Sequence, residues 1–155
     1  MSNQSTLPKL HLSLESNPAV KDVEFVRAQL TAYNCQFTEP DNHQPLAVFA
    51  HGPEQAIVGG LLGGTYWGWL HVDILWIKDE FRRQGMGRAL LAAAEQEAIQ
   101  RGCRYVHLET HTFQAVEFYQ KQGYVIFGEL PDLPAGYTKY FLKKTLNLAK
   151  EKPRR

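Results

Sequence analysis

Glycine and arginine are concentrated in one short segment, residues 81–88, which reads Phe-Arg-Arg-Gln-Gly-Met-Gly-Arg. The apolar run before it, residues 70–77, predicts a strand, and the Ala/Leu-rich residues 89–100 after it predict a helix. The first turn of a helix presents N–H groups that have no intrahelical acceptor, and the helix dipole adds partial positive charge there. Three arginines in that turn oppose the dipole, which favours a bound anion. We therefore predict a site for a phosphorylated ligand.

Two common phosphate-binding motifs do not fit this segment. The P-loop requires a glycine, four residues and then Gly-Lys-Ser/Thr, and nothing in the chain matches it. The dinucleotide fingerprint G-x-G-x-x-G would need its third glycine at the position of Leu90. That fingerprint also opens the first βαβ unit of a fold, whereas a three-strand meander is predicted before this turn. Both nucleotide interpretations are therefore disfavoured.

A second motif lies downstream, where residues 115–124 follow the pattern Ala-x-x-Phe-Tyr-x-x-x-Gly-Tyr. Together with Arg82-x-x-Gly85-x-Gly87, it closely resembles the motifs of the GNAT family of N-acetyltransferases. That family has Arg/Gln-x-x-Gly-x-Gly/Ala and, after a helix and a strand, Phe-Tyr-x-x-x-Gly-Phe/Tyr. The resemblance covers residues 9–144 and includes the order of the elements. It implies an N-acetyltransferase with acetyl-CoA as co-substrate.

The resemblance also implies which residues bind coenzyme A. Backbone amides of the glycine turn would hold the pyrophosphate, because glycine permits close approach and unusual dihedral angles. The preceding strand would pair with the pantetheine amides as a further strand does. The family often has Asn where this chain has Thr112, so we expect Gln114 to take over that contact and Thr112 to cap the next helix. The expected cofactor-binding residues are Leu75, Trp76, Ile77, Arg82, Arg83, Gln84, Gly85, Met86, Gly87, Arg88 and Gln114.

Acetyl transfer to an amine requires an acid for the leaving thiolate, and Tyr119 is the predicted donor. A phenol with a pKa of ~10 keeps its proton at neutral pH. The resemblance places the tyrosine of the Phe-Tyr pair at the sulfur of the cofactor. The alternative is that Tyr119 packs in the core together with Phe118, because both lie on one helical face with Ala115.

The amine must also lose a proton, and the predicted base is His71 or Asp73. Counted back from Gly85, both fall where GNAT enzymes often carry a residue that accepts this proton, sometimes through water. Histidine has the better-matched pKa, about 6.5, whereas Asp73 would need burial, or would orient His71 or bind a cationic substrate. If no bulge intervenes, both side chains and that of Leu75 point the same way. The alternative is a partly exposed sheet histidine. By resemblance, the N–H of Ile77 or a neighbour polarises the thioester carbonyl.

A further alternating set, His107, Glu109 and His111, could form a metal site or line the substrate pocket. His107-x-Glu109 is similar to the His-x-Glu of zinc deaminases, but both cysteines, Cys35 and Cys103, precede it, so the downstream Pro-Cys-x-x-Cys is absent. We expect pocket residues and no metal. Five aromatic residues are expected in the core or in a pocket wall for a flat or cationic substrate. They are Trp67, Trp69, Trp76, Tyr137 and Tyr140.

The pattern of the chain predicts an α/β (α+β) fold, with a mixed, mostly antiparallel sheet flanked by helices. We expect a disordered segment at residues 1–8, one domain at residues 9–146 and a basic tail at residues 147–155. The expected strands are residues 9–15, 46–51, 55–66, 69–78, 104–110, 124–129 and 137–144. The expected helices begin at Asn17-Pro18, Gly87 and Gln114 and end near Asn34, Gln100 and Gln122.

Composition limits the class of protein. The 155 residues are 44% hydrophobic and 21% charged with a net charge of +1, which is ordinary for a globular domain and disfavours nucleic acid and membrane as partners. The polar N-terminus and the two cysteines favour a cytoplasmic location.

The leading hypothesis is an acetyltransferase for a small-molecule amine, acting by direct attack in a ternary complex. The alternatives are a protein (Lys or N-terminal) acetyltransferase and a non-catalytic CoA-binding regulatory module. A homodimer is compatible with the sequence.

Overall fold

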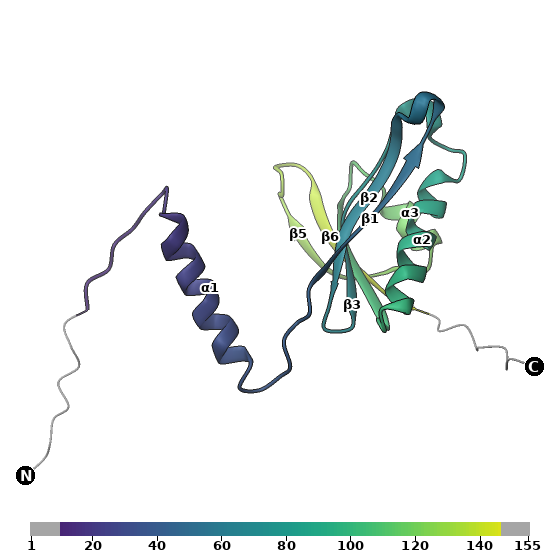
Figure 1. The fold of residues 1–155 in the computed structure, drawn as a ribbon. Helices are drawn as coiled ribbons and strands as arrows, with labels where there is room; N and C mark the ends of the chain where they lie inside the picture. The colour runs from purple at the N-terminus through teal and green to yellow at the C-terminus, as the bar shows by residue number, and fades with distance from the viewer. Residues whose placement is uncertain (1–9, 147–155) are drawn as a thin grey trace, which may run out of the picture. The chain divides into compact units, whose positions relative to one another are not determined.

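The structure is a computed structural model that describes residues 10–146. The chain divides into two compact units, and the boundary between them in the sequence follows Pro40. The first unit contains helix α1 (Val20–Asn34), which begins after Ala19 and ends as predicted (Figure 1). Residues 10–15 form no strand, so the strand predicted at 9–15 is wrong for its described part. Alternating leucines become a strand only where a neighbouring strand supplies hydrogen-bond partners, and this segment pairs with none among the described residues.

The second unit is built on one six-stranded sheet in the order β1-β2-β3-β4-β6-β5. Neighbouring strands run antiparallel except for β3 and β4, which are parallel. The strands are β1 (Gln44–His51), β2 (Ile57–Tyr66), β3 (Trp69–Ile77), β4 (Tyr105–His111), β5 (Val125–Pro131) and β6 (Thr138–Thr145). The helices are α2 (Met86–Gln100) and α3 (Val116–Lys121), with short 3-10 turns η1 (Pro53–Gln55) and η2 (Asp79–Phe81). The mixed, mostly antiparallel sheet flanked by helices is confirmed. The expected division into a tail at each end and one domain between them stays a prediction, and residues 1–9 and 147–155 lie outside the described residues.

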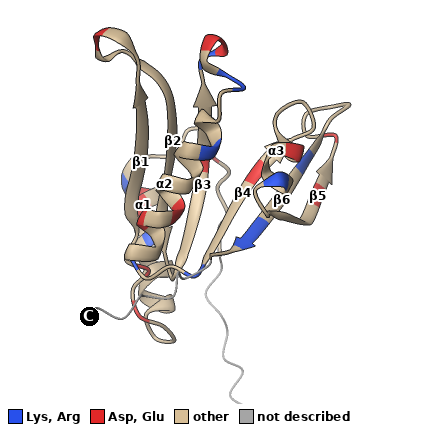
Figure 2. Cartoon of the chain, turned by 90° about the vertical axis from the view of Figure 1, so that its right-hand side faces the viewer, with Lys and Arg blue, Asp and Glu red and all other residues tan. Residues whose placement is uncertain are grey.

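Helix α2 packs on the sheet through a stripe of small and aliphatic side chains. Leu90, Leu91, Ala94 and Ala98 are buried at helical spacing. The helix can approach β2 closely because Gly59 has no side chain: a Cβ there would lie 3.1 Å from Met86 Sδ. Figure 2 shows α2 in front of β1, β2 and β3, and α3 in front of β4 and β6. The two helices therefore cover the same face of the sheet.

Strand β3 contains a bulge at Asp73. Val72 pairs with Gly63 on β2 and Ile74 pairs with Leu62, so Asp73 is an extra residue without a partner. A Cβ on Gly63 would collide with the carbonyl oxygen of His71, which is why glycine stands opposite the bulge. Beyond Asp73 the alternation of side chains is reversed.

The reversal corrects one sequence-based expectation. Leu75 pairs with buried Leu61 and lies on the core side together with Val72, whereas His71 shares the opposite face with exposed Ile74. His71 and Leu75 therefore do not point the same way. The expectation held only for a strand without a bulge, and this bulge depends on the pairing of β3 with β2.

Strands β3 and β4 pair over only four residues each. Trp69 to Val72 run beside Tyr105 to Leu108, and no pair follows although both strands continue. Figure 2 shows the two strands side by side at one end and apart at the other. The edge of β3 after Val72 therefore has no strand neighbour on the β4 side within residues 10–146.

Candidate active site

The turn between β3 and α2 presents a row of unused backbone donors. Arg83 and Gly85 both have positive φ, 63° and 80°, and Gly85 is the residue before the first helical residue, Met86. The first helical hydrogen bond here runs from Ala89 N to Gly85 O. Within residues 10–146, the N–H groups of residues 84–88 donate to no acceptor. This is the anion-binding geometry that the sequence predicts, and it fits a pyrophosphate.

The two glycines of the turn have different roles. Gly85 occupies the left-handed region with no other atom within 4 Å of a Cβ position, so its requirement is conformational. Gly87 is buried, and a Cβ there would lie 3.1 Å from Ile77 Cδ1 and 3.3 Å from Phe118 Cζ. Gly87 therefore lets the first turn of α2 pack against β3 and α3.

The arginines of the turn do not act as one cluster. Arg82 donates from Nε to the carbonyl oxygen of Ile77 (3.0 Å) and forms an ion pair with Asp79 (3.0 Å). Its guanidinium therefore holds the turn to the end of β3. Arg83 and Arg88 are exposed, so their side chains are accessible to an anion in solvent. Gln84 uses its side-chain amide on the carbonyl oxygen of Glu80 (3.2 Å) and keeps its backbone N–H unused.

The free edge of β3 offers alternate backbone groups. Lys78 N donates to Val58 O (2.8 Å), which makes these two residues a hydrogen-bonded pair. Antiparallel ladders alternate, so Trp76 spends its N–H and C=O on β2, whereas Ile77 and Leu75 direct theirs away from β2. Leu75 and the N–H of Ile77 are thus the groups of this edge that can pair with an extended amide chain, because the Ile77 carbonyl already accepts from Arg82. The backbone of Trp76 cannot pair with such a chain.

Tyr119 is in the core cluster and is 6% exposed. Its ring contacts Phe118 and Tyr124, at centroid distances of 5.1 and 5.7 Å. Burial raises the pKa of its phenol to about 12. Its hydroxyl has no hydrogen-bond partner within residues 10–146. Every fully enclosed side-chain oxygen or nitrogen in the same residues does have a partner, so this hydroxyl is not fully enclosed. The hydroxyl of Tyr119 therefore reaches the surface as a protonated, unused donor.

His71 lies in a row of polar side chains that crosses three strands. His71 on β3 is the register partner of His107 on β4, which is the partner of Lys143 on β6. The rings of His71 and His107 stack with centroids 4.5 Å apart. Burial, followed by the neighbouring His71, lowers the pKa of His107, and its Nε2 lies 2.8 Å from the hydroxyl of Tyr66. Asp73 is exposed at the bulge, two residues beyond His71.

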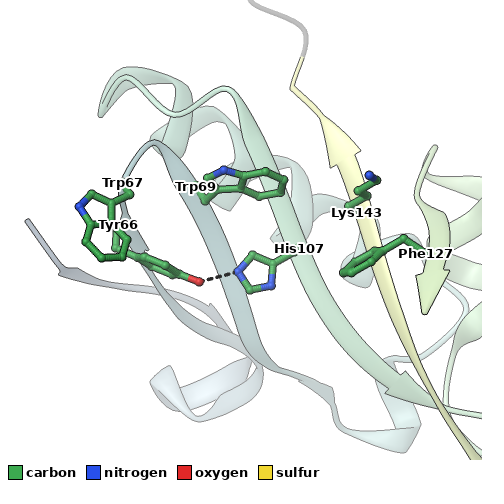
Figure 3. Close-up of a pocket in the computed structure, with 6 residues that line it drawn as sticks. All are labelled: Tyr66, Trp67, Trp69, His107, Phe127 and Lys143. Carbon is green, nitrogen blue, oxygen red and sulfur yellow. Dashed lines mark hydrogen bonds between the residues drawn. The ribbon is translucent and has the colours of Figure 1, made fainter. Parts of the chain in front are cut away.

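An open pocket of about 470 Å³ lies at the paired end of β3 and β4. Figure 3 shows Tyr66, Trp67 and Trp69 on one side of His107, and Phe127 and Lys143 on the other. None of these residues belongs to η2 or α2, so this pocket is separate from the glycine turn. Trp67, Trp69 and His107 were expected in a pocket from the sequence, whereas Tyr66, Phe127 and Lys143 were not, because strands far apart in the sequence bring them together.

The alternative that His107, Glu109 and His111 form a metal site is not supported by their positions. Within residues 10–146, no group of three or more His, Cys, Asp or Glu side chains is close enough to hold an ion. Glu109 forms an ion pair with Lys139 (2.9 Å), and His111 Nδ1 lies 3.0 Å from Gln114 Oε1. Glu109 and His111 are therefore engaged by neighbouring side chains, and neither of them lines the pocket that contains His107.

Comparison with known proteins agrees with the motifs. A family model described as the acetyltransferase (GNAT) family matches residues 11–124. The chain belongs to the GNAT acetyltransferase family. Blasticidin-S acetyltransferase of Streptomyces morookaense is 43% identical over 101 residues, which cover 64% of this chain and 74% of that protein. An acetyltransferase of Agrobacterium fabrum is 35% identical over 120 residues, which cover 77% of this chain and 87% of that protein.

Solved structures show the same fold. An acetyltransferase from Bacillus cereus superposes with a TM-score of 0.80 at 31% identity, over 86% of this chain and 98% of its own. The resemblance and the enzyme class predicted from the sequence are thereby confirmed, and GNAT acetyltransferases use acetyl-CoA as the acetyl donor. Within the described residues, no helix is long and apolar enough to cross a membrane.

This GNAT chain departs from expectation just before α3. Thr112 does not cap the helix, because its hydroxyl accepts a hydrogen bond from Thr138 N (3.3 Å) and α3 begins only after Ala115. The side-chain oxygen of Gln114 accepts from His111 N (2.9 Å) and lies 3.3 Å from the hydroxyl of Thr110. Gln114 thus closes the end of β4. A cofactor contact by its amide nitrogen stays a prediction.

Proposed function

We propose that this GNAT enzyme transfers the acetyl group of acetyl-CoA to a primary amine of a small molecule by direct attack in a ternary complex. The observation that carries the proposal is the run of unused N–H donors at residues 84–88. It adjoins the free edge of β3. The similarity to blasticidin-S acetyltransferase supports a small-molecule acceptor.

The backbone holds the donor substrate in this proposal. The N–H groups of residues 84–88 bind the pyrophosphate, and Leu75 and Ile77 pair with the pantetheine amides. When bound, acetyl-CoA supplies a thioester whose acetyl group moves to the amine. The N–H of Ile77, directed away from β2, is available to stabilise negative charge that develops on the acetyl oxygen.

His71 is the proposed base. It lies on β3, on the face of the sheet opposite α2. The next residue, Val72, is the last residue of β3 that pairs with β4. The neighbouring His107 stays neutral because its pKa is lowered, so it does not repel a proton that His71 accepts from the amine, directly or through water. Asp73, exposed at the bulge, attracts the cationic amine before the proton is removed.

Tyr119 is the proposed acid for the leaving thiolate. Its pKa of about 12 keeps the phenol protonated at every pH at which the enzyme would be assayed, and its hydroxyl is not spent on another residue. A covalent route through Cys103 is disfavoured. That thiol is 2% exposed and burial raises its pKa, so it is neither accessible nor ionised.

A thiol-release screen with acetyl-CoA tests this proposal. The acceptors are an amine library that includes blasticidin S, together with peptides that carry a free Lys or N-terminus. We expect turnover with at least one small amine. His71→Gln should then lower kcat by about 100-fold or more, and Asp73→Asn should mainly raise the KM for the amine.

The matched control is His51→Gln, because His51 is exposed on β1 and, among the described residues, its ring hydrogen-bonds only with the carbonyl oxygen of Gln55. Turnover of peptides alone would support the protein acetyltransferase. Binding of coenzyme A without turnover of any amine would support the regulatory module. Either result would overturn the proposal.

A further inference from the structure

The aromatic pocket beside His107 contains one charged side chain among the described residues, that of Lys143. Its lining residues include one cation, Lys143, and no carboxylate. Lys143 lies over the ring of Phe127, with its Nζ 5.5 Å from the ring centroid, and forms no ion pair within residues 10–146. The nearby carboxylate of Glu109 is already paired with Lys139. The pocket therefore carries net positive charge between aromatic walls.

This charge argues against polycationic acceptors. Aromatic rings attract cations, but here a lysine of the chain already lies over one ring, and a second cation would be repelled by it. Trp69 stacks on Tyr105 with centroids 4.7 Å apart and meets His107 edge to face, so its wall is held in place by neighbours. Fixed flat walls favour a flat ring as their occupant.

The register of the sheet fixes how far the pocket's cation lies from the proposed base. Lys143 and His71 are partners of the same residue, His107, on neighbouring strands. Two strand spacings place their backbones about 10 Å apart. An acceptor whose anionic group meets Lys143 and whose amine meets His71 must therefore separate these two groups by roughly the length of one ring with its substituents.

We propose that this pocket, formed by Tyr66, Trp67, Trp69, His107, Phe127 and Lys143, binds the body of the acetyl acceptor, and that the acceptor class is a flat-ring amine carrying a carboxylate at the end remote from the amine. The inference rests on the proposed function, since it uses His71 as the base. Tyr66 holds His107 through its hydroxyl at 2.8 Å and thereby fixes the wall between the two ends of the acceptor.

Two probes that differ by one charge test the class. They are para-(aminomethyl)benzoate and para-(aminomethyl)benzamide, and the readout is kcat/KM for thiol release with acetyl-CoA. We expect the carboxylate to be preferred by about tenfold or more, as for a charge-assisted hydrogen bond. Lys143→Gln should abolish the preference, taken as the ratio of the two kcat/KM values within that variant, and Lys143→Arg should keep most of it.

Two controls isolate the pocket from general charge effects. Lys121→Gln removes the same charge from the exposed end of α3 and should leave the preference intact. Phenylalanine and its amide, in which the amine adjoins the carboxyl carbon, should show no Lys143-dependent difference, because such a molecule cannot span from His71 to Lys143.

A binding experiment separates this inference from the proposed function. The amine-free probes para-methylbenzoate and para-methylbenzamide are titrated while tryptophan fluorescence is followed, since Trp67 and Trp69 line the pocket. Tighter binding of the benzoate that disappears in Lys143→Gln supports the pocket assignment even if no amine is acetylated. Equal binding of both probes, unaffected by Lys143→Gln, would overturn it even if the enzyme turns over other amines.

Discussion

The imidazole rings of His71 and His107 stack face to face, 4.5 Å apart at a ring angle of 17°, on paired positions of parallel strands. Charging both rings at this separation is unfavourable, so one of them must stay neutral when the other takes a proton. His107 is the ring that the structure favours as neutral, because burial lowers its pKa and its Nε2 lies 2.8 Å from the hydroxyl of Tyr66. This arrangement is compatible with the proposed role of His71 as the base.

The pH dependence of stability should report on His107. Its pKa is lowered in the folded protein from the ordinary value of 6.5, mainly by burial, so the unfolded chain binds more protons below that pH. Stability is therefore full above about pH 6.5 and falls as the pH drops toward the folded pKa. We expect His107→Gln to have a flatter Tm profile between about pH 7 and pH 5, as measured by differential scanning fluorimetry. His51→Gln should retain the wild-type slope, and an unchanged slope in His107→Gln would contradict the assignment.

Tyr119→Phe should separate catalysis from stability. The hydroxyl makes no hydrogen bond to the described residues, so its removal should change the free energy of unfolding by less than about 1 kcal/mol. Loss of the acid should lower kcat by about 100-fold, with the KM for acetyl-CoA nearly unchanged. Steady-state kinetics and urea denaturation measure the two effects.

The control for that experiment is Tyr124→Phe, on the neighbouring buried tyrosine. Its hydroxyl donates to Glu95 Oε1 (2.7 Å), so this variant should lose about 1–3 kcal/mol of stability yet keep its kcat. If Tyr119→Phe kept full activity, or if both variants lost kcat equally, Tyr119 would be a packing residue only.

Two glycines of equal backbone strain should differ in their effect on the cofactor. Gly85 and Gly102 have φ of 80° and 85°, and neither has an atom within 4 Å of a Cβ position. Alanine at either should therefore cost a similar ~1–2 kcal/mol of stability. Only Gly85→Ala lies at the start of α2, so only this variant should weaken coenzyme A binding, measured by calorimetry. Equal affinities in the two variants would place the pyrophosphate elsewhere.

A partly buried ion pair joins α2 to β6. Glu95 accepts from Lys144 Nζ (2.9 Å) and from the Tyr124 hydroxyl, and its side chain is only 14% exposed. Glu95→Ala leaves a lysine and a phenol without their acceptor and should lower the free energy of unfolding by about 3 kcal/mol. Glu97→Ala, whose ion pair with Arg101 is more exposed, should cost about 1 kcal/mol or less. Urea denaturation of both variants gives the comparison.

Local patterns predicted most of the second unit. Leu90, Leu91, Ala94 and Ala98 repeat at helical spacing, and they are the buried stripe of α2. Gly102 takes the left-handed conformation that ends this helix, with Cys103 N donating back to Ala98 O (2.9 Å). Such features depend on residues a few positions apart and are therefore visible in a sequence.

Features that depend on strand pairing were not predictable. The bulge at Asp73 requires a residue without a side chain at Gly63 on β2, and the contact between Tyr66 and His107 joins residues 41 positions apart. The run at residues 10–15 alternates as a strand should but has no partner strand among the described residues. The sequence could therefore locate the glycine turn, but not the wall that contains Phe127 and Lys143, and the role of Tyr119 stays a prediction.

The short pairing of β3 with β4 divides the sheet into two three-stranded halves, which are β1-β2-β3 and β4-β6-β5. Within residues 10–146, backbone hydrogen bonds join the two halves where Trp69 to Val72 run beside Tyr105 to Leu108 and, just before these residues, from Arg104 N to Gly68 O (3.0 Å). A ligand chain that pairs with Leu75 and Ile77, beyond the residues where β3 and β4 pair, connects the two halves of the sheet at a second place. Cofactor binding should therefore slow amide hydrogen exchange where β3 pairs with β4, several residues from the nearest atom that the cofactor touches.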